Sequence, residues 1–162
     1  MNIICEPHTC KKFIRRCKRI LNELSKIIDF DYKNLNLVIF NDLEDSDIFG
    51  EYFSAANTIR IPENKITSLD LLITVLSHEI VHANQSFLGK LILDSADGIY
   101  WRDEKYSSQH IYYKTAGASF EEYENWPWEI EARRMEKVLL DMIKPILHTT
   151  NSLPPIAFIP TK

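Results

Sequence analysis

The clearest hydrophobic pattern in the chain runs from Ser68 to Phe87 and predicts a buried helix. Leucines, isoleucines and an alanine recur on one side of a helical wheel, and Leu71 and Val75 add apolar residues on the opposite side. Thr67 and Ser68 are both candidate N-caps, the spacing of Thr67 and Asp70 resembles a capping box, and Gly89 predicts the end of the helix. A helix that is apolar on two sides is largely buried, so we expect its polar residues to face an enclosed site.

Periodicity predicts two further helices. The first is expected from an N-cap at Thr9 to about Phe30, and the last from Pro127 to about Leu147. Residues 147–162 then form an extended tail.

β-branched and aromatic residues predict short strands between the helices. Residues 35–40 form one strand, and residues 51–54 and 58–61 form a hairpin. Asp97-Gly98 predicts the turn of a second, short hairpin. This order predicts one α+β domain over residues 1–162, with a small, mainly antiparallel sheet.

Composition and charge narrow the class of protein. The chain has 162 residues, 45% apolar and 26% charged, which is typical of a globular domain with its own core. The net charge of -4 disfavours nucleic acid as a partner. One basic run has helical spacing, and we interpret it as the solvated face of the first helix. It consists of Lys11, Lys12, Arg15, Arg16, Lys18 and Arg19.

Neither a signal-peptide pattern nor a run long enough to span a membrane is evident in the sequence. We therefore expect a cytoplasmic protein without a membrane partner, in the host cytoplasm or the virion if its source is viral. The three cysteines, Cys5, Cys10 and Cys17, make a poor disulfide framework and are expected to be reduced, with Cys17 in the core. The sequence does not predict the oligomeric state.

The predicted buried helix carries an HExxH motif, formed by His78, Glu79 and His82. Histidines four residues apart lie on one side of a helix, so both imidazoles can ligate one Zn²⁺ ion. Glu79 then lies beside the metal, where it can accept a proton from a water on the ion. The alternative is a pair of hydrogen-bonded core histidines. We prefer the zinc site because the motif follows a buried apolar run within a helix.

A third ligand is expected in the last helix, within "PWEIEARR". An HExxH followed by such a helix resembles the gluzincin metallopeptidases, particularly the minimal ones, and small metallopeptidases of phages and bacteria. Their pattern, E-x-x-A-[DN], matches Glu129 to Arg133, with Glu129 as the ligand. The resemblance implies a zincin-like fold, a Zn²⁺ ion on His78, His82 and Glu129, and a peptide substrate.

The chain departs from this pattern at two points. Arg133 stands where the family has Asp or Asn, so a ligand histidine needs another hydrogen-bond acceptor. On a helical wheel Glu131 falls inside the apolar arc and Glu129 on its flank. That arc consists of Trp128, Ala132, Met135, Val138, Leu139 and Met142. Glu131 therefore stays open as an alternative ligand or as a residue that supports one, although the family pattern favours Glu129.

These features predict a zinc-dependent metallopeptidase in which Glu79 is the general base and a peptide pairs with the strand at 58–61. A tyrosine could stabilise the oxyanion. The candidates are Tyr106, Tyr112, Tyr113 and Tyr123. The alternative is a catalytically idle, metal-stabilised binding or virion-associated protein on the same scaffold. Glu79 favours the enzyme, because a purely structural metal site has no need of it.

Overall fold

The computed structural model describes residues 1–42, 48–94, 98–106 and 123–149. Within these ranges the chain is an α+β protein with three α-helices and two small sheets, as the sequence predicts at this level. The helices are α1 (Lys11–Ile27), α2 (Leu69–Phe87) and α5 (Pro127–Thr149). The first sheet contains β1 (Asn2–Cys5), β2 (Asn36–Phe40), β3 (Glu51–Phe53) and β4 (Thr58–Pro62), and the second contains β5 (Leu91–Asp94), β6 (Gly98–Trp101) and β7 (Glu104–Tyr106).

The first sheet has the strand order β1-β2-β4-β3. β1 and β4 both run parallel to β2, and β3 alone is antiparallel to its neighbour. The prediction of a mainly antiparallel sheet is therefore wrong for this sheet. The hydrophobic pattern did not predict β1, and the β1–α1–β2 connection is a helical crossover, which joins parallel strands.

The predicted hairpin is confirmed, because β3 pairs with β4 through Glu51–Arg60, Tyr52–Ile59 and Phe53–Thr58. β4 lies between β2 and β3, so its prediction as the strand that pairs with a substrate is wrong. Alternation of apolar and polar residues reports the two faces of a sheet and not its edges. The two edge strands of this sheet are β1 and β3, and β3 is the one that pairs with β4.

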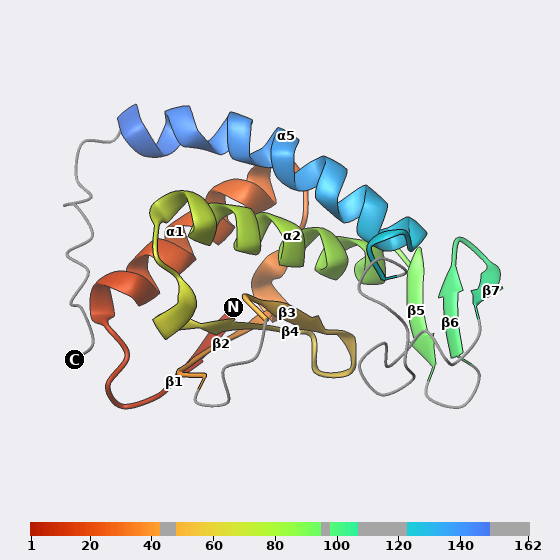
Figure 1. Cartoon of the computed structure of the whole chain (residues 1–162), viewed down its shortest axis with the longest axis horizontal. Helices are drawn as coiled ribbons and strands as arrows, with labels where there is room; N and C mark the ends of the chain where they lie inside the picture. Colours follow the sequence, from red (N-terminus) through yellow and green to blue (C-terminus); the bar gives the residue numbers. More distant parts are fainter. Residues whose placement is uncertain (43–47, 95–97, 107–122, 150–162) are drawn as a thin grey trace.

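The helices pack together on one side of the first sheet, and α5 lies along α2 (Figure 1). The buried stripe of α1 is confirmed and includes Cys17, but this helix begins at Lys11, after Cys10, and not at the predicted cap Thr9. α1 also ends at Ile27, before the predicted end. Arg16 is buried, which corrects its placement on the solvated face of α1.

The boundaries of the other two helices follow the prediction closely. Ser68 caps α2, because its hydroxyl oxygen accepts a hydrogen bond from the backbone N–H of Leu71 at 3.0 Å. α5 continues to Thr149, so residues 147–149 are helical and not part of the predicted tail. Residues 150–162 lie outside the described residues. No described helix is long and apolar enough to cross a membrane.

The second sheet stands at the end of the molecule where α5 begins (Figure 1). β5 and β6 are antiparallel, as predicted, although Asp97 of the expected turn lies outside the described residues. β7 adds a third strand that the sequence analysis missed. A small core joins this sheet to the start of α5, and its buried members are Leu91, Ile99, Trp101, Trp126 and Trp128. This core fixes the start of α5 beside the end of α2 that carries the histidines.

Candidate metal centre

The structure brings three of the predicted site residues to one point. His78 and His82 project from α2, and their Nε2 atoms lie 3.0 Å apart. In the carboxylate of Glu129, in the first turn of α5, Oε2 lies 3.3 Å from Nε2 of His78 and Oε1 lies 3.3 Å from Nε2 of His82. Ligand atoms around one tetrahedral ion with bonds of about 2.0–2.1 Å lie about 3.3 Å from one another. The three residues could therefore hold a metal ion.

The position of Glu129 follows from the buried face of α5. Val138 and Met142, which the wheel placed in the apolar arc, are 46% and 49% exposed. The face that packs inward consists of Trp128, Ala132, Leu139, Ile143 and Leu147. Glu129, only 3% exposed, belongs to this face. The wheel misplaced the carboxylate because the apolar arc of α5 is wider than its buried part.

His82 is oriented by a residue that the sequence analysis missed. Its Nδ1 atom lies 2.9 Å from Oε1 of Gln85, which is buried on the same helix. The amide nitrogen of Gln85 donates to the carbonyl of Trp128 at 3.1 Å and to the carboxylate of Glu131 at 3.0 Å. The amide oxygen is thus left to accept from His82, so His82 carries its hydrogen on Nδ1 and directs the lone pair of Nε2 towards the centre.

His78 has a carboxylate as its support. Its Nδ1 atom lies 3.1 Å from Oε2 of Glu136. Glu136 replaces the Asp or Asn expected after Ala132, while Arg133 forms an ion pair with Glu124 at 2.9 Å. A signal was present in the sequence, because Glu136 follows Glu129 by two helical turns and so lies on the same side of α5.

Glu131 supports the centre from a distance. It binds Gln85, and its other oxygen accepts from Arg102 at 2.8 Å and lies 3.6 Å from Nζ of Lys90. It therefore connects the residue that orients His82 to the turn between β6 and β7. The structure brings Glu129, and not Glu131, to the two histidines.

The charges and hydrogen-bonding groups of the centre favour the binding of a positive charge. Burial lowers the pKa of His78, but Glu129 and Glu136 outweigh it and raise the pKa to about 10. Burial raises the pKa of the Glu129 carboxyl, but the two imidazoles outweigh it and hold the pKa well below its usual range. Oε2 of Glu129 is buried and finds no donor in hydrogen-bond geometry among the described residues. A cation that replaced the proton on His78 would satisfy both imidazoles and the carboxylate.

Glu79 lines a cavity of about 280 Å³ together with His82 and Glu129. Burial raises the pKa of Glu79, and the neighbouring His78 and His82 lower it in part. A Cβ atom on Gly50 would lie 3.3 Å from Cγ of Glu79, so the glycine lets the segment before β3 approach α2 closely.

Two surfaces form the walls of this cavity. Gly50, Glu51 and Tyr52 belong to β3 and the residue before it, and a second part of the lining is apolar. The apolar wall comes from the second sheet and the start of α5, through Leu91, Leu93, Ile99, Trp126 and Trp128. The space beside the candidate metal centre therefore has one wall with a strand edge and one apolar wall.

The tyrosine candidates have different positions. Tyr123 lines the cavity, whereas Tyr106 packs against Trp128 with ring centroids 5.3 Å apart. Tyr112 and Tyr113 lie outside the described residues. Of the described candidates, Tyr123 is therefore the one beside the candidate centre.

No family model, curated protein or solved structure matches the chain. The resemblance to gluzincins consequently rests on the two sequence motifs alone. The structure adds a cluster of His78, His82 and Glu129 that could hold a metal ion, within an α+β fold.

Proposed function

We propose that the chain is a zinc-dependent metallopeptidase. The observation that carries the proposal is the convergence of His78, His82 and Glu129 beside a cavity that His82, Glu129 and Glu79 line. Two imidazoles and a carboxylate form a donor set of catalytic zinc sites, which leave one position for water or substrate. Zinc bound there would acidify a water molecule and polarise the carbonyl of a peptide bond.

Glu79 is the general base in this proposal. Its carboxylate accepts a proton from the attacking water and then donates it to the leaving amine. Burial suits Glu79 for both steps, because it raises the pKa of the carboxyl group. The carboxylate is then a stronger base, and its protonated form persists closer to neutral pH and can act as the acid. Among the described residues, no side chain makes a hydrogen bond to Glu79 that would compete for this proton.

We assign the binding of substrate to the outer edge of β3 in place of β4. The unpaired edge of a strand can accept an extended peptide as an additional strand. β3 forms a wall of the cavity through Glu51 and Tyr52, so a peptide added there would pass beside Glu79. The apolar wall favours a substrate with an apolar side chain next to the cleaved bond.

The test compares Glu79→Gln with the wild type on a broad peptide library, after both proteins have been loaded with zinc. The substitution is nearly isosteric and removes a base whose loss typically costs about 10²–10⁴-fold in rate. We expect the variant to keep its zinc and its melting temperature and to lose cleavage. Glu104→Gln, the same change at an exposed position in β7, is the matched control and should cleave as the wild type does.

Two results would contradict the proposal. Cleavage that persists in zinc-loaded Glu79→Gln would exclude Glu79 as the base. A zinc-loaded wild type that cleaves no peptide in the library would support the alternative, a catalytically idle protein that the metal stabilises.

A further inference from the structure

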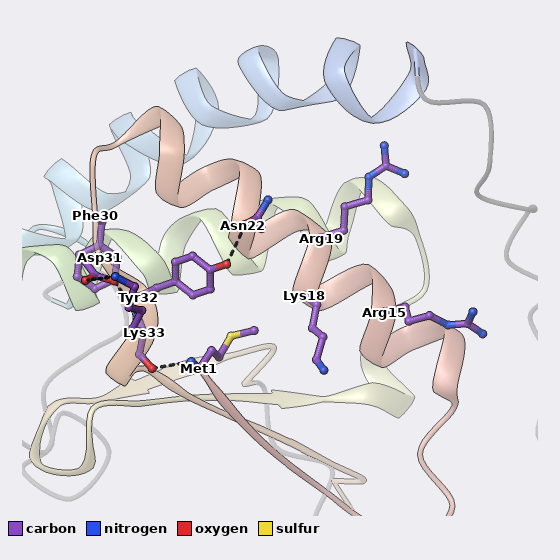
Figure 2. Close-up of a pocket in the computed structure, with 9 residues that line it drawn as sticks. All are labelled: Met1, Arg15, Lys18, Arg19, Asn22, Phe30, Asp31, Tyr32 and Lys33. Carbon is purple, nitrogen blue, oxygen red and sulfur yellow. Dashed lines mark hydrogen bonds and ion pairs between the residues drawn. The ribbon is translucent and has the colours of Figure 1, made fainter.

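A second cavity, of about 640 Å³, lies between α1 and the segment 30–33. It shares no lining residue with the cavity beside the histidines. Figure 2 shows Arg15, Lys18 and Arg19 extending from α1, and Tyr32 reaching from the neighbouring segment to α1. Lys33 adds a fourth cationic side chain to the lining, against the single carboxylate of Asp31.

The charges of this cavity do not cancel. Asp31 accepts from the backbone N–H of Lys33 at 3.1 Å and lies 3.4 Å from its Nζ atom, so Lys33 balances its charge. Within the described part of the chain, Arg15 donates only to a neutral backbone carbonyl, that of Lys11, at 3.3 Å. Neither Lys18 nor Arg19 forms an ion pair with any residue in the described ranges. Among the side chains that line the cavity, Arg15, Lys18 and Arg19 thus leave an excess of three positive charges.

The carboxylate nearest in sequence does not compensate this excess. Glu23, one turn beyond Arg19, is bound to Lys26 at 2.9 Å and to the side-chain amide of Asn22 at 2.9 Å. The attraction between Glu23 and Arg19 is the smallest of the effects that lower the pKa of Glu23. The positive charge of the cavity therefore remains available to a ligand.

This arrangement works against the stability of α1. The helix has no acidic residue of its own in its first turn, where Lys11 and Lys12 oppose the helix dipole and the carboxylate of Glu63, from outside the helix, accepts from the backbone N–H of Cys10 at 3.2 Å. Arg15 and Arg19, four residues apart, repel each other. A helix face that is merely solvated gains from mixed charges, and the chain as a whole is acidic, with a net charge of -4. An anion held by these residues would remove the repulsion.

We propose that this cavity binds a small molecule that carries phosphate groups. Its volume is in the range of small-molecule sites. Guanidinium groups bind phosphate oxygens in pairs, and lysine adds a point charge, so Arg15, Lys18 and Arg19 suit more than one phosphate group. The opposite wall is held in place, because the hydroxyl of Tyr32 donates to Oδ1 of Asn22 at 2.9 Å.

The test uses inorganic pyrophosphate as the probe and follows the backbone amide signals of the ¹⁵N-labelled protein by NMR. We expect saturable shifts for residues of α1 and of the segment 30–33, and not around His78 and His82. The double variant Arg15→Gln/Arg19→Gln should bind at least about tenfold more weakly, because it removes two charge-assisted contacts. It should remain folded, since it also removes the repulsion between these residues.

Lys12→Gln is the matched control, because Lys12 is a cation of the same helix that does not line the cavity. Its affinity for pyrophosphate should stay within about twofold of the wild type, since it makes no contact that the ligand replaces. An equal loss in Lys12→Gln and in the double variant would overturn the proposal in favour of unspecific attraction to a basic helix. The absence of shifts at millimolar pyrophosphate, or shifts centred on the histidines, would also overturn it. If a nucleic-acid oligomer bound more tightly than pyrophosphate through the same arginines, the proposal of a small-molecule ligand would be overturned in favour of a nucleic acid.

Discussion

His82 donates the hydrogen of its Nδ1 atom to Oε1 of Gln85, 2.9 Å away and three residues further along α2. Gln85 is in turn held by α5, through the carbonyl of Trp128 and the carboxylate of Glu131. α5 therefore supplies both the carboxylate of the cluster, from Glu129, and the groups that hold Gln85, which orients the imidazole of His82. A metal ligand whose second nitrogen is held in this way keeps its tautomer and its orientation.

Gln85→Leu tests this framework. Leucine has a similar size but cannot accept the hydrogen of Nδ1, so we expect zinc affinity to fall about 10–100-fold while the fold is kept. Competition with a chelating dye measures the affinity. Asn84→Leu is the control, because it makes the same chemical change at the preceding residue, whose side chain is not a hydrogen-bond partner of His82 among the described residues. Equal losses of affinity in the two variants would contradict a specific role of Gln85.

The two glutamates of α5 are expected to differ in their effect on the metal. The wild type should hold about one zinc ion per chain, and Glu129→Ala should lose most of it, because it removes a ligand atom. Glu131→Ala should lower the affinity by a smaller factor, since Glu131 acts only through Gln85. Metal analysis after purification without chelator, together with dye competition, measures both effects. If Glu131→Ala lost more zinc than Glu129→Ala, the assignment of the ligand would be reversed.

The sequence predicts those parts of the site that lie within one helix. The spacing of His78 and His82 is enough to place both imidazoles together, because the geometry of a helix is fixed. The pattern E-x-x-A selected Glu129, which the structure brings to the two histidines, although the wheel argued for Glu131. The wheel failed because it treats every apolar residue as buried, and the exposed Val138 and Met142 shifted the expected face.

Other features depend on contacts between segments that are distant in sequence. Gln85 and Glu136 support the histidines only because α2 and α5 pack side by side, and no local pattern reports that packing. The direction of β4 and its place inside the sheet depend on β1, a strand of four residues with little periodicity. Hydrophobic patterns report which face of an element is buried, and much less well which element is its neighbour.

The proton on His78 gives the last prediction, which concerns pH. In the metal-free protein, burial lowers the pKa of His78, but the contacts with Glu129 and Glu136 outweigh burial. The pKa is therefore raised from 6.5 to about 10. The stability that this group contributes is full below pH 6.5 and is lost as the pH rises through about 10. Glu129, whose pKa is lowered from 4.5, contributes stability above pH 4.5 that is lost as the pH falls through its folded-state pKa. The pair therefore stabilises the metal-free protein most between about pH 4.5 and 6.5.

Zinc must displace the same proton, so its affinity should rise about tenfold for each pH unit towards 10, after correction for the chelator used in the competition. An ordinary histidine would give no such rise above pH 7.5, because it would already be neutral there. NMR titration of the imidazole signals in chelator-treated protein measures the pKa of His78 directly. A titration of His78 near pH 6.5 would contradict both the strength of its contacts with Glu129 and Glu136 and the competition between the proton and the metal.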